Sequence, residues 1–152
     1  MKPFEAIQAL NRLLRTLCSS LPMYLADAKP WTRSEDTKLT AAMCHLVADR
    51  QMYAQRLAEA VESRGGRPDT GRFSTEFTAK NDLSLEFLLI ELIDDQEQDV
   101  AAIERYVAQL AGDPALHALA EEILGNARGH LDILQEMLND ELKPLAASQF
   151  CC

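Results

Sequence analysis

The sequence is poor in glycine and proline. Its 152 residues include only six of each, too few for a β-sandwich, whose many turns depend on these two residue types. It also lacks an apolar run of the roughly 18 residues that a membrane-spanning helix needs. The first residues, MKPFEAIQALNRLLRTL, are interrupted by polar and charged positions and do not resemble a signal peptide. A reduced, cytoplasmic protein is therefore expected.

Basic residues are scarce as well. The chain has 15 Lys and Arg against 24 Asp and Glu, which gives a formal net charge of -9. An acidic surface repels phosphate backbones, so nucleic acid is not an expected partner. The apolar fraction of 47% and the length are ordinary for one globular domain, here residues 1–152. No glycine-rich phosphate loop, nucleophile elbow or paired-cysteine metal motif is present.

The four cysteines do not form the framework of a small disulfide-rich domain. Cys18 and Cys44 fall inside helical patterns and are expected to be small buried apolar groups. Cys151 and Cys152 end the chain, in a segment (143–152) that is predicted to be a flexible tail. For this terminal pair, intermolecular disulfides and lipid attachment both stay open.

Helical periodicity dominates the rest of the chain. Apolar residues recur every three or four positions, the period of an amphipathic helix. Pro22 lies inside the first such stretch and predicts a kink or a loosened last turn. Thr32 and Glu35 form a capping-box pattern at the start of the second. The predicted helices cover residues 3–28, 32–64, 83–111 and 114–142.

The connections between these helices predict their directions. Gly65 and Gly66, followed by Pro68, end the second helix, and Asp113 starts the fourth as its N-cap. Residues 67–82 have neither a helical nor a strand period and make the longest connection. A link of this length can join parallel neighbours, whereas short links join antiparallel ones. The sequence thus predicts an all-α, up-down-down-up four-helix bundle.

Two segments carry a resemblance to a known family. AQRLAEAVESRGGRP at 54–68 and EEILGNARGHLDILQEML at 121–138, with a weaker match in LNRLL at 10–14, resemble the ferritin-like superfamily, and bacterioferritin most of all. The resemblance implies a ferritin-like bundle and a di-iron centre. Such a centre takes one Glu from each of two helices and a Glu-x-x-His from each of the other two.

The ligand positions that the resemblance implies are mostly lost. Carried over residue by residue, they fall on Leu17, Arg50, Tyr53, Gln96, Ala127 and His130. Leucine and alanine cannot ligate a metal, and an arginine would place a positive charge beside the iron. Only the histidine survives, so no cofactor is expected, and iron is the alternative.

The alignment of the middle helices leaves other metal ligands open. If the third helix is shifted, its ligand position falls on Ile93 or Asp94 instead of Gln96, and Asp95 also comes within reach. A shift of one residue in the second helix offers Asp49. The weak candidates for an atypical metal site are therefore Asp49, Asp94, Asp95 and His130.

The residues that replace the ligands suggest a different centre. Buried polar groups need partners, and a hydrogen-bonded cluster of these side chains would satisfy them without a metal. The arginine would need a carboxylate, for which the nearest candidates are Asp49, Asp95 and Asp99. In the alternative, these side chains reach the surface and do not meet. The predicted cluster consists of Arg50, Tyr53, Gln96 and His130.

Two classes of function remain from the sequence. One is a non-catalytic structural or interaction module that has kept the bundle without an intact di-iron centre. The other is an iron-handling protein or oxidoreductase that uses His130 with carboxylates of the second and third helices. The resemblance also implies a homodimer that forms side by side through the first two helices, with His45, Met52 and Arg56 as contact residues.

Overall fold

The protein is a bundle of helices. The computed structural model describes residues 1–28, 37–81 and 83–150, with side chains at 1–28, 38–81 and 83–140. These residues contain helices and no strand, so the predicted all-α fold is confirmed. The elements are α1 (Pro3–Cys18), α2 (Leu21–Ala28), α3 (Thr37–Ser63), the 3-10 helix η1 (Thr75–Lys80), α4 (Leu85–Gln109) and α5 (Pro114–Phe150).

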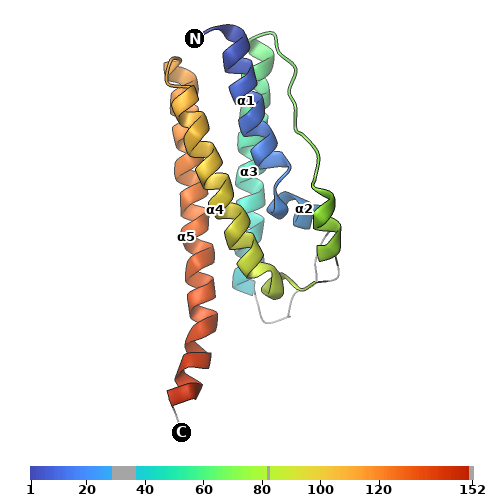
Figure 1. Cartoon of the computed structure of the whole chain (residues 1–152), viewed down its shortest axis with the longest axis vertical. Helices are drawn as coiled ribbons and strands as arrows, with labels where there is room; N and C mark the ends of the chain where they lie inside the picture. Colours follow the sequence, from blue (N-terminus) through green and yellow to red (C-terminus); the bar gives the residue numbers. More distant parts are fainter. Residues whose placement is uncertain (29–36, 82, 151–152) are drawn as a thin grey trace.

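Four of these helices, α1, α3, α4 and α5, lie side by side (Figure 1). α1 and α5 run in one direction and α3 and α4 in the other, so the predicted up-down-down-up order is confirmed. α1 packs against α3 and α4, and α5 packs against the same two helices on the opposite side. No helix among the described residues is long and apolar enough to cross a membrane.

Helix ends follow the capping residues that the sequence offers. Ser84 accepts a hydrogen bond from Phe87 N at 3.2 Å and starts α4, and Asp113 accepts one from Leu116 N at 3.2 Å and starts α5. α3 ends at Ser63 before Gly65, whose φ of 79° suits glycine. The capping-box prediction at Thr32 and Glu35 lies outside the described residues.

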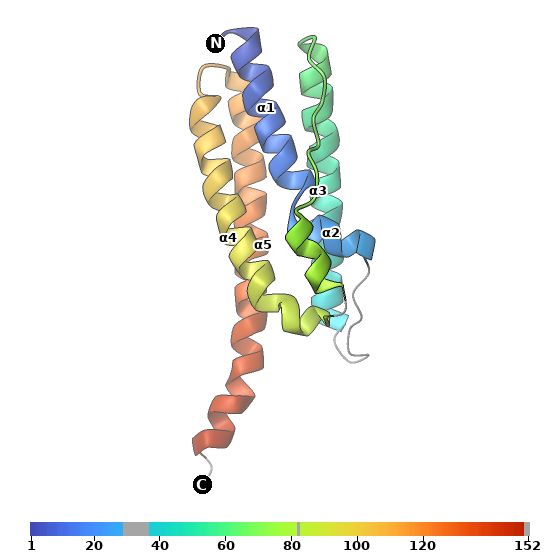
Figure 2. The ribbon, with the colours of Figure 1, turned by 45° about the vertical axis from the view of Figure 1, so that its right-hand side comes forward.

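The first predicted helix is two helices in the structure. α1 ends at Cys18 and α2 begins at Leu21, so the single helix predicted over 3–28 is wrong. The break has a local cause, because Ser20 Oγ donates to Leu17 O at 2.9 Å and Leu21 N donates to Asp95 Oδ2 at 3.3 Å. Pro22 therefore lies in the first turn of α2, where its missing N–H is harmless. α2 turns away from the direction of α1 (Figure 2).

The last helix is longer than predicted. The backbone of α5 is helical to Phe150, beyond the end expected near residue 142, and it projects past the other helices (Figure 1). The extra residues include leucine and two alanines, which are strong helix formers. The flexibility expected for 143–152 stays a prediction.

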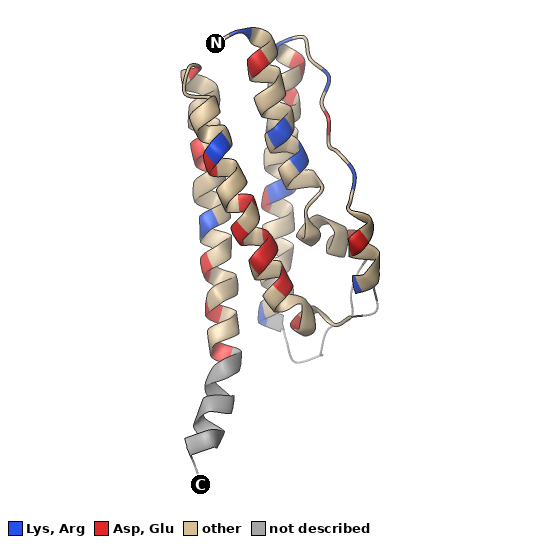
Figure 3. Cartoon of the chain, viewed as in Figure 1, with Lys and Arg blue, Asp and Glu red and all other residues tan. Residues whose placement is uncertain are grey.

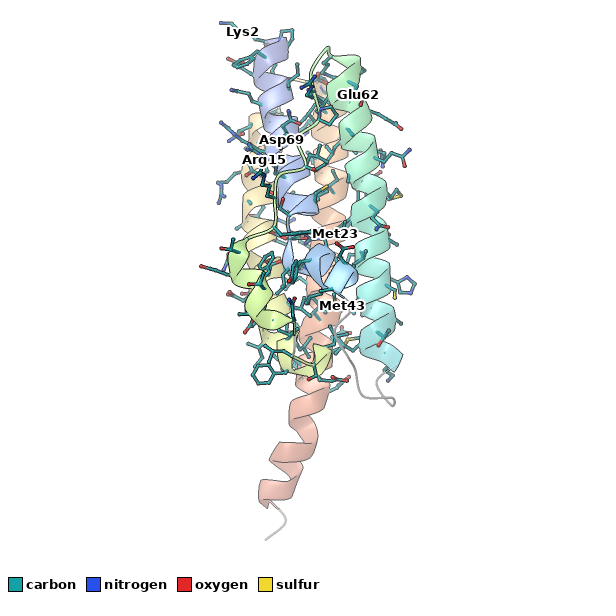
Figure 4. All side chains as sticks on the ribbon, turned by 90° about the vertical axis from the view of Figure 1, so that its right-hand side faces the viewer. Lys2, Arg15, Met23, Met43, Glu62 and Asp69 are labelled. Atoms are coloured by element: carbon teal, nitrogen blue, oxygen red, sulfur yellow. The ribbon has the colours of Figure 1, made fainter. Side chains whose placement is uncertain are left out.

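The crossover between α3 and α4 is held against the first helix. Asn11 Nδ2 donates to Arg67 O at 3.0 Å, and Ser19 Oγ donates to Thr70 O at 2.8 Å. Arg15 and Asp69 form an exposed ion pair at 3.5 Å (Figure 4). These contacts tie the long link to α1 along much of its length.

The crossover also contains a helix that the sequence pattern does not reveal. η1 (Thr75–Lys80) begins at Ser74, whose hydroxyl accepts from Glu76 N at 3.3 Å. Tyr24 of α2 packs edge-on against Phe73 and at a tilt against Phe77. The contacts of Phe73 and Phe77 with Tyr24 hold η1 against α2. Because they depend on a residue outside the link, the sequence of residues 67–82 alone does not reveal η1.

The core consists of two apolar blocks, which come from the upper and the lower parts of the bundle as it is drawn in Figure 1. The upper block contains Leu10, Leu57 and Ile103 among others, and the lower block contains Leu46 and Leu89. Polar residues separate the blocks at mid-height. We call Arg50, Asp95, Gln96 and Asp99 the polar layer; Arg50 and Gln96 are 3% and 0% exposed.

Candidate functional site

The centre of the polar layer is a hydrogen-bonded chain that crosses the bundle. Arg50 Nη2 of α3 donates to Gln96 Oε1 of α4 at 2.6 Å. Gln96 Nε2 donates to the carbonyl oxygen of Ala127 in α5 at 2.9 Å. The amide of Gln96 thus bonds on both sides, and three helices are joined at one level. Leu17 of α1 is buried in the adjoining upper block.

Arg50 has its counter-charge on α4. Its Nη2 lies 2.9 Å from Asp99 Oδ2, with the arginine side chain 4% and the aspartate side chain 15% exposed. The carboxylate oxygen lacks a well-aligned hydrogen bond, so the pairing is by charge. Arg50 Nη1 is buried and has no hydrogen-bond partner. Among the described residues, the guanidinium is therefore held by the charge of Asp99 and by its hydrogen bond to Gln96.

Two aspartates share this one guanidinium. Burial raises the pKa of Asp99 to about 6, against the lowering effect of Arg50. Burial also raises the pKa of Asp95, whose Oδ2 accepts from Leu21 N at the start of α2. One cation beside two buried carboxylates leaves an excess of negative charge, which makes protonation of Asp99 easier than in water.

His130 belongs to a separate contact between α3 and α5. Its Nε2 lies 2.7 Å from Asp49 Oδ2, and Asn126 Nδ2 donates to the same oxygen at 2.8 Å. The hydrogen bond from Asn126 lowers the pKa of Asp49, and His130 and His45 add to the effect. His130 is 8% exposed, so it does not reach out to solvent. Asn126 was not predicted, although it stands one helical turn before His130 on the same face.

Tyr53 faces a different neighbour from those predicted for it. Burial raises the pKa of its hydroxyl, and a hydrogen bond with Glu122 of α5 raises it further. Arg56 lies over the ring with its guanidinium carbon 5.6 Å from the centroid and also pairs with Glu122. The structure thus brings Arg50 to Gln96 and Asp99, but turns Tyr53 to Glu122 and His130 to Asp49.

The cysteines differ from their prediction. Cys44 is exposed and Cys18 is half-buried, so only one of them approaches the small buried group that was expected. Burial raises the pKa of the Cys18 thiol, while the charge of Arg50 lowers it. Cys44 lies on the outer face of α3, because its neighbours Met43 and Leu46 take the inward positions.

The residues at the centre do not fit a di-iron site. Leu17 and Ala127 offer no side-chain donor atom, and the guanidinium of Arg50 is itself a cation. Gln96 uses its oxygen and nitrogen within the protein. The other carboxylate candidate, Asp94, is at the surface and accepts from Gln98 at 3.1 Å. In the part of the chain that the structure describes, no group of three His, Cys, Asp or Glu residues could hold a metal ion.

Comparison with known proteins agrees with the resemblance seen in the sequence. The model of the ferritin-like domain matches residues 7–142, which is most of the chain. Comparisons with curated protein sequences and with solved structures found no match.

Proposed function

Because the chain belongs to the ferritin-like family yet carries a buried guanidinium in its central layer, we propose that it works without a di-iron centre, as a structural or interaction module. The observation that carries the proposal is the contact of Arg50 with Asp99 and Gln96. A cation supplied by the protein already occupies the position next to the buried carboxylates. A second cation there would meet electrostatic repulsion in a region of low dielectric.

The test is the metal content of the whole chain. Protein expressed in iron-supplemented medium, untagged and purified without chelator, is analysed for iron, manganese and zinc. Less than about 0.1 ion per chain, with an unfolding midpoint that EDTA leaves unchanged, supports the proposal. Near-stoichiometric metal would overturn it.

One contact favours the alternative of an atypical metal or iron-handling site. His130 Nε2 and Asp49 Oδ2 lie 2.7 Å apart, and both groups can ligate a metal. If metal is found, His130→Ala tests whether the ion is bound by His130 and Asp49. Loss of the metal in this variant would place the ion at the α3–α5 contact, and retention would place it elsewhere.

We further propose a homodimer through α1 and α3, in the cytoplasm. Support for the dimer comes from the outer face of α3, where His45, Met52 and Arg56 are exposed and Met52 is 47% exposed. The free thiols of Cys18 and Cys44 suit a reducing compartment.

Sedimentation equilibrium tests the dimer: Met52→Asp is expected to yield monomers. The control Ile90→Asp on α4 changes an equally apolar exposed residue and is expected to leave the mass unchanged. A wild-type monomer would contradict the dimer.

A further inference from the structure

The first turns of α4 expose two large apolar side chains. Phe87 is 65% and Ile90 66% exposed, although both lie within a folded helix. They stand three residues apart, so they are neighbours on one face. The same face continues through the exposed carboxylates Asp94 and Glu97, at spacings of four and three residues. An apolar pair thus adjoins a run of negative charge on one side of the helix.

The charge around this face is mostly negative. Between residues 81 and 104 the sequence holds eight acidic residues and no Lys or Arg. Three of the eight pair with cations from elsewhere, Glu91 with Lys80, Glu104 with Arg128 and the buried Asp99 with Arg50. On α5, residues 129–140 add three acidic residues and again no Lys or Arg. Figure 3 shows acidic residues along α4 and the lower part of α5, and basic residues on α1, the crossover and α3, with others on α4 and α5.

Neutral amides contact two of the surface carboxylates. Asp94 accepts from the neutral amide of Gln98 at 3.1 Å, and Glu97 accepts from that of Gln135 at 3.2 Å. Asp132 is exposed one turn before Gln135 on the same face of α5. Amides satisfy these carboxylates without neutralising them, so their negative potential extends into solvent.

This pattern selects one kind of occupant. A second copy that used the same face would bring like charges together across a twofold axis, which costs binding energy. A helix with apolar residues on one stripe and Lys or Arg beside it has the complementary arrangement. Its apolar residues would cover Phe87 and Ile90, and its cations would lie over the carboxylates.

We propose that a surface formed by Phe87, Ile90, Asp94, Glu97 and Asp132 binds a cationic amphipathic helix of another protein. The inference rests on the proposed function, since it names the class of partner for an interaction module. It is tested separately, because none of these five residues belongs to the polar layer. Metal content and peptide binding are independent measurements.

The probe is a fluorescent 18-residue peptide of Leu and Lys in a helical amphipathic pattern, and the matched control replaces each Lys by Glu. Fluorescence anisotropy with the full chain is expected to show saturable 1:1 binding of the Lys peptide only. Phe87→Ser/Ile90→Ser is expected to weaken binding about 30-fold, or about 2 kcal/mol. Phe4→Ser removes an aromatic ring that is 68% exposed on α1 and is expected to leave binding unchanged.

A second variant, which changes only charge, tests the same surface if Phe87→Ser/Ile90→Ser folds poorly. Asp94→Asn/Glu97→Gln preserves shape, and it is expected to weaken binding about tenfold and to flatten the dependence on NaCl. Equal binding to the wild type and to both variants would overturn the proposal, because it would show only diffuse attraction to an acidic protein. If Phe87→Ser/Ile90→Ser instead converts a wild-type dimer to monomer, the occupant is a second copy and the proposal fails.

Discussion

Arg50 is the residue whose removal should disturb the molecule most. Replacing it by alanine leaves Asp99 buried without its cation and Gln96 without its donor. The loss of one partner from a buried pair typically costs about 3–5 kcal/mol. We therefore expect Arg50→Ala to lower the free energy of unfolding by about that amount, measured by urea denaturation followed by circular dichroism.

Arg56→Ala is the matched control. Its guanidinium pairs with Glu122 at the surface, with both side chains about half exposed, and exposed pairs contribute only about 0–1 kcal/mol. If Arg50→Ala lowers the free energy of unfolding no more than Arg56→Ala does, water reaches the polar layer, and burial does not strengthen the interactions of Arg50.

Asp99 gives the stability of the protein a particular dependence on pH. Its pKa is about 6 in the folded protein against 3.8 for the unperturbed group, so the folded state holds the proton more tightly. This stabilisation is fully present below pH 3.8 and is lost as the pH rises through 6. We expect the free energy of unfolding to be higher at pH 5 than at pH 7 by about 1 kcal/mol, measured by urea denaturation.

Asp99→Asn isolates this effect. The amide cannot ionise, so the difference between pH 5 and pH 7 is expected to shrink in the variant even though its overall stability changes. Asp49 does not produce the same trend, because its pKa is lowered and its contribution is lost only at more acidic pH. A variant that keeps the full wild-type difference would assign the dependence to another group.

Side-chain partners were the least predictable feature of the site. The ligand positions implied by the ferritin-like resemblance placed Arg50 and Gln96 at one level, and helical periodicity indicated that both face inward. Asp99 was named among the carboxylates that Arg50 might use. The sequence could not decide the partner of Tyr53, since its hydroxyl direction depends on how α3 and α5 are spaced. Glu122 and Asn126 meet their partners across that helix pair, a contact between residues far apart in the chain.

At the scale of elements, the crossover lies close to Arg15 and Ser19 at Gly71. Its φ is +71°, and a Cβ there would stand 2.6 Å from Ser19 Oγ and 3.0 Å from Arg15 Cγ. Ser19 is already fixed by its bond to Thr70 O. We expect Gly71→Ala to lower the free energy of unfolding by about 1–2 kcal/mol, measured by thermal and urea denaturation.

Gly125→Ala is the opposite case. Gly125 lies inside α5, and a Cβ added there would meet nothing within 4 Å. Alanine in a helix interior is favoured over glycine, so this variant is expected to gain about 0.5–1 kcal/mol. If both variants lower the free energy of unfolding equally, the positive φ and the close contacts at Gly71 do not determine the effect of its substitution.

Helix positions were predictable, and helix interruptions were not. Periodic leucines, the N-cap at Asp113 and the stop at Gly65 are local features, so the sequence located the end of α3, both ends of α4 and the start of α5 to within a few residues, whereas α5 ends well beyond its predicted end. The break after Cys18 depends on Asp95 of α4, which accepts from Leu21 N across the bundle. Within residues 3–28, Pro22 indicates a kink nearby, but no local pattern fixes the break after Cys18.

The whole molecule carries its charge unevenly, and salt should reveal this. The acidic stretch 81–104 and the acidic part of α5 lie on neighbouring helices and repel one another. We expect the melting temperature to rise by about 2–4 °C between 20 and 500 mM NaCl, as screening weakens that repulsion. Differential scanning calorimetry measures the shift.

The triple variant Asp94→Asn/Glu97→Gln/Asp132→Asn removes three of these charges. Its melting temperature is expected to be higher at low salt and to change less as salt is added. A wild-type melting temperature that falls with NaCl would show that exposed attractive ion pairs, such as Arg56 with Glu122, outweigh the repulsion.

The two leucine-rich blocks on either side of Arg50 would, by themselves, permit the helices to slide. Moving α3 along the bundle by one turn, about 5.4 Å, still sets apolar residues against apolar residues. Such a slip would push the guanidinium into apolar side chains and separate it from Asp99, at a cost that leucine packing cannot offset. The polar layer thus fixes the register of the bundle, as a single buried polar residue does in a coiled coil.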